Sequence, residues 1–233
     1  MTRSTLLSGF VLVAAGLLVA GSPLREAQAR HHRHRGDTPA SNAGSGAATG
    51  FDYYLMALSW SPGFCATHPR EAEQCGSKEY GFVLHGIWPQ YERGYGPQHC
   101  AAENGPDAAT VARMLPIMPS RHLIQHEWET HGSCSGLGAS AYFDVAARAF
   151  TSVRIPAALQ TPHSPPRLTA GQVLTGFAQA NPGMPMNALS VHCSGNELAE
   201  VRVCLGPDLS PRRCGAKVDS NCPASVLRIP ATR

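Results

Sequence analysis

With 233 residues, the chain is long enough for one domain of ordinary size, or two small ones, around a buried core. Its net charge of +3 belongs to the first 50 residues, because residues 51–233 carry 14 basic and 14 acidic side chains. A neutral body is not a non-specific binder of polyanions, since such binding requires many contacts from Lys and Arg to phosphates. Any nucleic acid would therefore be bound locally, in a cleft.

The first 29 residues are expected to be a signal peptide. The apolar run 6–20 is too short for a comfortable membrane span, and the small-x-small pattern Ala27-Gln28-Ala29 marks a cleavage site. The alternative is an uncleaved anchor, which the charged pair Arg25-Glu26 disfavours. We therefore expect an exported protein, periplasmic or extracellular, that keeps no stable membrane anchor after cleavage.

Residues 30–50 read RHHRHRGDTPASNAGSGAATG and contain no apolar side chain larger than those of alanine and proline. Such a segment has nothing to contribute to a core, so it is expected to be a disordered linker. Its histidines and arginines could hold a metal ion or contact an anionic surface, although a solvated tail is the simpler explanation. Folded structure is expected over residues 51–233, as a single domain.

The first half of this domain is expected to hold two strands and a helix. The run 51–60, FDYYLMALSW, predicts a buried strand that stops at the Ser-Pro-Gly sequence of residues 61–63. A second strand is expected over residues 80–88, ended by Pro89. Ser120 is expected to cap the helix that follows.

The second half is expected to hold two helices and a late strand. Ser140 is expected to cap one helix, and Thr169 with Gln172 forms a predicted capping box for the other. Apolar and charged residues alternate over residues 199–205, which predicts a half-buried strand. Because strands and helices are mixed without regular βαβ alternation, the sequence predicts the α+β class.

The eight cysteines are spread along the chain and form no C-x-x-C pair, which disfavours a zinc finger. In an exported protein their even number predicts four disulfides, but spacing alone does not select the pairing. They are Cys65, Cys75, Cys100, Cys134, Cys193, Cys204, Cys214 and Cys222.

The segment FVLHGIWPQ, residues 82–90, places a histidine inside an apolar strand. The two-residue period of a strand puts His85 on the face of Val83 and Ile87, opposite Trp88. Taken alone, His85 fits an inert, hydrogen-bonded core histidine better than a catalytic one.

The segment HEWETHGSC, residues 126–134, is expected to form a helix on which residues four apart share a face. Glu127 would then lie beneath His131, and His126 beneath Thr130. A carboxylate beneath an imidazole raises the pKa of that imidazole and fixes its tautomer, which is typical of an oriented acid or base. A solvated helix end is the alternative for any one of these residues.

The HExxH pattern of zinc proteases is not present. The two histidines at 126 and 131 are five residues apart, which separates them by about 140° around a helix, so they would not bind one ion.

The two histidine segments together resemble the ribonuclease T2 family. HGIWP is similar to its first active-site segment, usually HGLWP, and HEWETHGSC is similar to the second, usually HEWxKHGTC. The likeness extends to FDYYLMALSWSPGFC, MPSRHLIQHEW and HCSGNELAEVRVCL, and covers about residues 51–222. It implies a central, mostly antiparallel sheet packed by helices and stapled by four disulfides.

The resemblance implies an endoribonuclease that cleaves single-stranded RNA through a 2′,3′-cyclic phosphate. The 2′-hydroxyl of RNA is the nucleophile, one imidazole removes its proton, and a second protonates the leaving oxygen. His131 is the expected base and His85 the expected acid, although the two roles could be exchanged, with Glu127 orienting His131 and polarising the phosphate. Two imidazoles of ordinary pKa, about 6.5, predict a bell-shaped pH profile on the acid side of neutral. No cofactor, metal or protein partner is implied.

By the same resemblance His126 and Thr130 would bind the phosphate, and Trp88 would stack on a base, unless it is only a core residue. The chain departs from the family at Thr130, where the usual residue is a lysine that would stabilise transition-state charge. The alternative function is therefore an exported RNA-binding module with weak or lost catalysis, unless an arginine such as Arg121 substitutes. Gln90 also replaces a common aspartate, which leaves the base preference open.

The resemblance also implies the disulfide pairing. Cys100–Cys134 would anchor the helix that carries His131 and matter most for activity, while Cys193–Cys222 and Cys204–Cys214 would staple the late strands, which leaves Cys65–Cys75. Each disulfide would add about 2–4 kcal/mol of stability.

Overall fold

The computed structural model describes residues 50–102, 104–160, 166–223 and 225–231. The expected signal peptide lies outside these residues, as does the expected linker apart from Gly50. In this described part of the chain, no helix is both long enough and apolar enough to cross a membrane.

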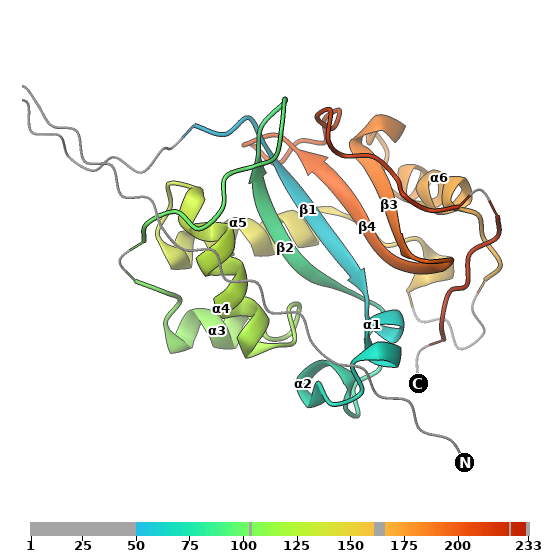
Figure 1. Ribbon diagram of the computed structural model, residues 1–233, viewed down its shortest axis with the longest axis horizontal. Helices are drawn as coiled ribbons and strands as arrows, with labels where there is room; N and C mark the ends of the chain where they lie inside the picture. The colour runs from blue at the N-terminus through green and yellow to red at the C-terminus, as the bar shows by residue number, and fades with distance from the viewer. Residues whose placement is uncertain (1–49, 103, 161–165, 224, 232–233) are drawn as a thin grey trace, which may run out of the picture. The chain divides into compact units, whose positions relative to one another are not determined.

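Four antiparallel strands form one sheet in the order β2-β1-β4-β3 (Figure 1). The strands are β1 (Tyr53–Trp60), β2 (Phe82–Gln90), β3 (Leu189–Ser194) and β4 (Glu197–Leu205). β1 and β4 are the central pair, and both are rich in apolar residues on the face that is covered by helices. The predicted α+β class and the central antiparallel sheet are confirmed.

One of the two prolines expected at strand ends, Pro89, lies inside its strand instead. Pro89 lies within β2, opposite Tyr54, because β2 is an edge strand on which a missing N–H costs no ladder hydrogen bond. Ser61-Pro62-Gly63 ends β1 as expected but also begins α1 (Ser61–Thr67), with Pro62 in the first turn, where proline is favoured.

The longer helices cover one face of the sheet or extend along its edge. α5 packs behind β1 and β2, α6 packs behind β3, and α4 lies along β2 (Figure 1). Their apolar side chains join those of the strands in one main core. The helices are α2 (Ala72–Cys75), α3 (Ala108–Met114), α4 (Arg121–Thr130), α5 (Ala139–Ser152) and α6 (Ala170–Ala180). The short 3₁₀ turns are η1 (Gly132–Cys134), η2 (Ala157–Leu159) and η3 (Met186–Ala188).

The helix caps follow the sequence in two cases of three. Ser120 caps α4 by accepting from the N–H of Leu123, and Thr169 forms the predicted capping box of α6 with Gln172. The expected Ser140 cap is wrong, because the N-cap of α5 is Gly138, two residues earlier, and the Ser140 hydroxyl accepts from Arg113 instead.

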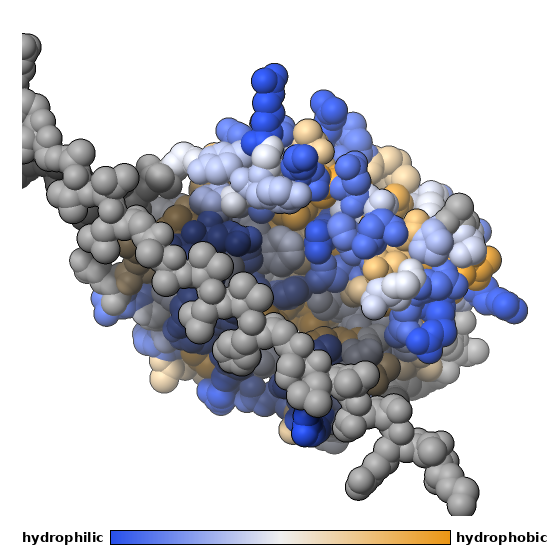
Figure 2. Space-filling view, viewed as in Figure 1, coloured by the Kyte–Doolittle hydropathy of each residue, from blue (hydrophilic) through white to orange (hydrophobic). Residues whose placement is uncertain are grey.

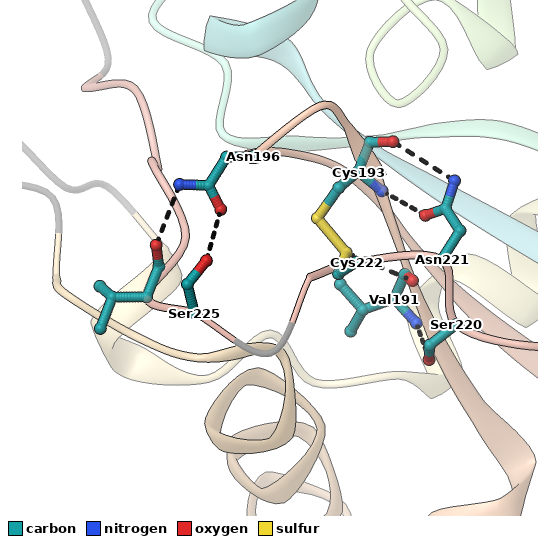
Figure 3. Close-up of a disulfide and its surroundings, with 8 residues drawn as sticks. Val191, Cys193, Asn196, Ser220, Asn221, Cys222 and Ser225 are labelled. Carbon is teal, nitrogen blue, oxygen red and sulfur yellow. Dashed lines mark hydrogen bonds between the residues drawn. A yellow bond between two sulfur atoms is a disulfide. The ribbon is translucent and has the colours of Figure 1, made fainter.

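The structure contains four disulfides, and they join the pairs that the family resemblance implied: Cys65–Cys75, Cys100–Cys134, Cys193–Cys222 and Cys204–Cys214. Figure 3 shows how Cys193–Cys222 ties the C-terminal segment to β3. The Asn221 side chain accepts from the Cys193 N–H and donates to its carbonyl, and Ser220 accepts from the N–H of Val191. The late strands are thus held by covalent and polar links together.

Candidate active site

A β-bulge in β2 presents His85. The β1–β2 register shifts between Ala57 and Leu58, which leaves His85 without a partner on β1. One extra residue moves the in–out alternation by one position, so Ile87 enters the core while Trp88 lies on the same side as His85. The expectation that Trp88 lies opposite His85 is therefore wrong, and the bulge is the reason.

Gly86 allows α4 to approach β2 closely. A Cβ at this position would overlap the Glu127 carboxylate and would lie 2.5 Å from Nε1 of Trp88. Only a residue without a side chain fits, so the backbone of β2 forms one wall around Glu127. Tyr142 of α5 also holds this part of β2, because its hydroxyl donates to the carbonyl of Ile87 at 2.7 Å.

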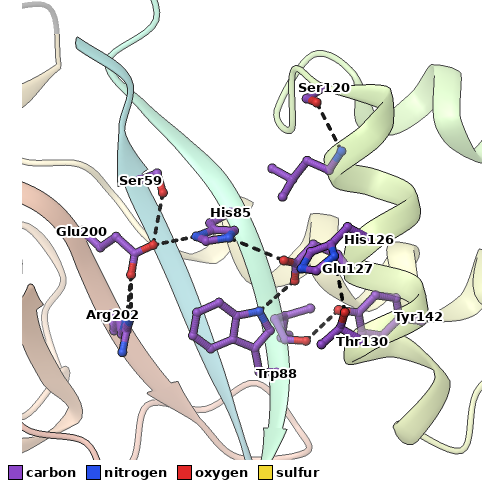
Figure 4. Close-up of polar contacts among 12 residues, drawn as sticks. Ser59, His85, Trp88, Ser120, His126, Glu127, Thr130, Tyr142, Glu200 and Arg202 are labelled. Carbon is purple, nitrogen blue, oxygen red and sulfur yellow. Dashed lines mark hydrogen bonds and ion pairs between the residues drawn. The ribbon is translucent and has the colours of Figure 1, made fainter. Parts of the chain in front are cut away.

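His85 lies between two carboxylates (Figure 4). Its Nδ1 is 2.6 Å from Oε1 of Glu200, and its Nε2 is 3.5 Å from Oε1 of Glu127. Burial opposes a charge on this imidazole, but the hydrogen bond and charge of Glu200, with the charge of Glu127, outweigh it. The pKa of His85 is therefore raised above its ordinary value of 6.5.

Glu127 is buried and joins His85 to Trp88. The Trp88 indole N–H donates to Oε2 of Glu127 at 2.7 Å, while the other carboxylate oxygen faces His85. Burial raises the pKa of Glu127 to about 7, although the charge of His85 and the Trp88 hydrogen bond pull it down. Near neutral pH a substantial fraction of this carboxyl group is therefore protonated.

His131 lies just beyond the end of α4 rather than within it. The helix ends at Thr130, and His131 leaves the helical conformation, so it does not stack on Glu127. Burial, followed by the charges of His126, His85 and His99, lowers the pKa of His131 to about 4. The expectation that Glu127 orients His131 and raises its pKa is therefore wrong, because both Glu127 oxygens are directed at β2.

The Nδ1 atom of His131 is buried, and no hydrogen-bond partner for it exists among residues 50–102, 104–160, 166–223 and 225–231. A buried imidazole without an acceptor for a second N–H is disfavoured as a cation. His131 is therefore a neutral imidazole at ordinary pH.

The two imidazoles meet at the ring of Trp88. The ring centre of Trp88 is 5.4 Å from that of His85 and 5.1 Å from that of His131. The two imidazoles are thus no farther apart than the sum of these distances, although 46 positions in the sequence separate them. The site therefore brings His85, whose pKa is raised, close to His131, which is neutral.

His126 and Thr130 lie at the same site. His126 is exposed on α4, and its Nδ1 is 3.5 Å from the Thr130 hydroxyl. A pocket of about 300 Å³ is lined by both His126 and His85. A second pocket, of about 440 Å³, extends from His85 over β4, so that His85 forms part of the wall of both.

The face that bears these pockets is open and polar. Figure 2 shows mostly hydrophilic side chains on the coloured part of this face, with apolar patches between them. Within the described ranges of the chain, no group of three or more His, Cys, Asp or Glu side chains is arranged to hold a metal ion.

A family model described as "Ribonuclease T2 family" matches residues 51–214. The chain belongs to the ribonuclease T2 family. A curated relative, "Ribonuclease" of Aeromonas hydrophila, is 52% identical over 101 residues, which are 43% of this chain and 46% of that protein. "Ribonuclease DdI" of Dictyostelium discoideum is 25% identical over 208 residues, which are 78% of this chain and 86% of that protein. The match spans less than half of the length of the Aeromonas protein and of a second curated relative, "Probable ribonuclease" of Haemophilus influenzae.

Solved structures of T2 ribonucleases share the fold. The structure described as "RNase NT in complex with 5'-AMP" aligns with a TM-score of 0.62 and 23% identity, over 78% of this chain and 98% of that one. The "RNase-related protein from Calystegia sepium" aligns with a TM-score of 0.61 and 21% identity, over 76% of this chain and 96% of that one. The resemblance read from the two histidine segments is confirmed at the level of family and fold.

Two residues of the site, Glu200 and Arg202, were missed by sequence reasoning. They lie two positions apart on β4, so they share a face, and their charges were assigned to the solvated side of a half-buried strand. The face of β4 that bears them is also the face of the sheet that bears His85. This follows from the strand order, which the T2 motifs in β2 and α4 do not reveal.

Arg121, the suggested substitute for the lysine of the T2 motif, contacts Glu73 in this structure. The Arg121 guanidinium pairs with Glu73 at 3.2 Å, and both side chains are largely exposed. The arginine that contacts site residues is Arg202, which is bound to Glu200 and lies 5.2 Å above the Trp88 ring.

Proposed function

We propose that this chain is an endoribonuclease that cleaves single-stranded RNA by transphosphorylation, with His85 and His131 as its acid and base and without a metal ion. Membership of the T2 family supports the RNA endonuclease activity. The observation that carries the mechanism is the pair of imidazoles beside Trp88, one with a raised and one with a lowered pKa.

The opposite pKa shifts favour one assignment of roles over its reverse. A general base must be unprotonated, and burial keeps His131 neutral above about pH 4. A general acid must hold a proton, and the two carboxylates around His85 keep it protonated to a higher pH than an isolated imidazole. His131 would take the 2′-hydroxyl proton while His85 protonates the leaving 5′-oxygen, which closes a 2′,3′-cyclic phosphate.

The remaining site residues are proposed to bind and hold the substrate. His126 and the Thr130 hydroxyl would bind the phosphate, and Glu127 would hold His85 and Trp88 in place. Trp88 is proposed to stack on a base, a contact worth about 1–3 kcal/mol that accepts any base. Its N–H is already occupied by Glu127, so the ring is held in one orientation before RNA arrives.

Incubation of the purified protein with single-stranded RNA and with DNA tests this function. RNA is expected to be cut to products with 2′,3′-cyclic phosphate ends, and DNA is expected to remain intact because it lacks the nucleophile. Excess EDTA is expected to leave the rate unchanged, with products identified by mass spectrometry. Loss of all activity in EDTA, or cleavage of DNA, would contradict the proposal.

The second candidate function, an RNA-binding module with weak catalysis, is motivated by Thr130. For the proposed enzyme, Thr130→Lys is expected to change kcat by less than tenfold, because the exposed His126 imidazole would still bind the phosphate. A crippled enzyme would instead gain about 100-fold or more, the usual worth of one preorganised donor. Gln125→Lys, on the exposed side of the same helix, controls for the added charge.

A further inference from the structure

Glu200 reaches His85 across an intervening strand. Glu200 is on β4, His85 is on β2, and β1 lies between them with Ser59 directly opposite Glu200. The small side chain of Ser59 leaves room for the carboxylate to pass, and its hydroxyl donates to Oε1 of Glu200 at 3.3 Å. The same oxygen accepts from Nδ1 of His85 at 2.6 Å, the shorter of the two contacts that His85 makes to carboxylates.

The other oxygen of Glu200 is held by Arg202. Nε of Arg202 donates to Oε2 at 2.9 Å, and one terminal nitrogen lies 2.8 Å from the same oxygen. The guanidinium also lies 5.2 Å from the centre of the Trp88 ring. Each carboxylate oxygen thus has its own partner, and the carboxylate plane is fixed from both sides (Figure 4).

The charge of Glu200 persists across the working range of pH. Its side chain is 12% exposed. Burial alone would raise the pKa of this group, but the hydrogen bond and charge of His85, together with Arg202, lower it to about 2. A fixed negative charge therefore lies against Nδ1 of His85 at every pH at which RNA cleavage would be measured.

Several other ionisable groups lie around His85 on neighbouring elements. Glu127 comes from α4 and lies 3.5 Å from Nε2 of His85, and His131, just after α4, also contacts the Trp88 ring that His85 contacts. The walls of the two adjoining pockets hold more distant ionisable groups, Glu71, His122 and His126 on one side and His68, His192, Glu197 and Arg202 on the other. Of these, Arg202 acts on the pKa of His85, which its charge lowers.

We propose that Glu200 is the positioning residue of His85. It accepts the Nδ1–H, which fixes the tautomer and turns Nε2 toward the site, and Arg202 holds the carboxylate in that orientation. When Nε2–H is donated to the leaving oxygen, the neutral ring keeps its proton on Nδ1, and Nε2 is ready to be protonated again. This role rests on the proposed ribonuclease function.

Glu200→Gln tests the role through the titration of His85, followed by NMR of the imidazole ring. The amide keeps the size of the side chain but removes its charge. The pKa of His85 is expected to fall by about one unit or more, and the alkaline limb of the kcat/KM profile is expected to move down with it. kcat is expected to fall more than KM changes, because Glu200 does not touch the substrate.

Glu197→Gln is the matched control. Glu197 lies on the same strand, is 14% exposed and pairs with Arg228, but it does not contact His85. Glu197→Gln is expected to change neither the pKa of His85 nor the pH profile of kcat/KM. Glu200→Asp is the second variant should the glutamine variant not fold, because it keeps the charge beside Arg202 and withdraws it from Nδ1. It is expected to lower kcat while shifting the pKa of His85 less.

The possible outcomes separate this inference from the proposed function. If the unaltered protein cleaves RNA and Glu200→Gln changes neither the His85 pKa nor kcat, Glu200 is only part of a structural ion pair. If the unaltered protein does not cleave RNA at all, the proposed function fails, and the positioning role fails with it. An active protein whose variant shows a lowered His85 pKa and a shifted alkaline limb supports the inference.

Discussion

Replacing His85 with alanine is expected to lower kcat/KM for RNA cleavage by about 100- to 10,000-fold, the usual contribution of a general acid or base. The loss is expected mainly in kcat, because His85 transfers a proton in the transition state and other groups bind the substrate. The measurement is steady-state cleavage of a short single-stranded RNA at several pH values.

Two controls accompany this variant. One is its thermal unfolding, and the other is an alanine substitution at a second histidine. The main core does not include the His85 side chain, which is 33% exposed, so the variant is expected to fold, and its thermal unfolding midpoint is the check. His68→Ala removes an exposed imidazole that is stacked on Phe64 at 4.3 Å, and it is expected to keep activity. Normal cleavage by the folded His85→Ala protein would place the acid elsewhere.

The sequence predicted the features that depend on local physics. The buried strand of β1, the Ser120 cap and the Thr169–Gln172 capping box each follow from residues within one turn or one strand of each other. The two histidine segments together also identified the T2 family correctly, although His85 taken alone fitted an inert core histidine better than a catalytic one.

The wrong predictions concern features that depend on contacts between residues far apart in the sequence. The bulge at His85 is set by the pairing of β2 with β1, and it puts Trp88 on the face that simple alternation assigned to Ile87. The end of α4 at Thr130 removes His131 from the helical stripe of Glu127, so an i,i+4 pairing that looked sound does not form. Glu200 joins the site only because β4 lies next to β1.

The corrected contacts change the expected pH dependence. Two imidazoles of ordinary pKa would give a narrow bell near 6.5. With the pKa of His131 lowered to about 4 and that of His85 raised above 6.5, activity is expected to rise through about pH 4 and to fall only above the ordinary histidine value. The result is a plateau rather than a sharp optimum.

Replacing His131 with alanine is expected to cost as much as replacing His85, about 100- to 10,000-fold in kcat/KM, and to remove the limb near pH 4 from what activity remains. The double variant is expected to lose little more than either single one, since acid and base act in one step. Measurement of pH profiles for all three variants checks both statements.

The position of the acid limb also distinguishes the two groups of the site that could serve as base. Glu127 has a pKa raised to about 7, so a Glu127 base would place the rise near neutrality, three units above a His131 base. A rise near pH 4 that disappears in His131→Ala assigns the proton transfer to the imidazole. A rise near pH 7 that survives this substitution and disappears in Glu127→Gln would assign it to the carboxylate, and His131 would then only shape the site.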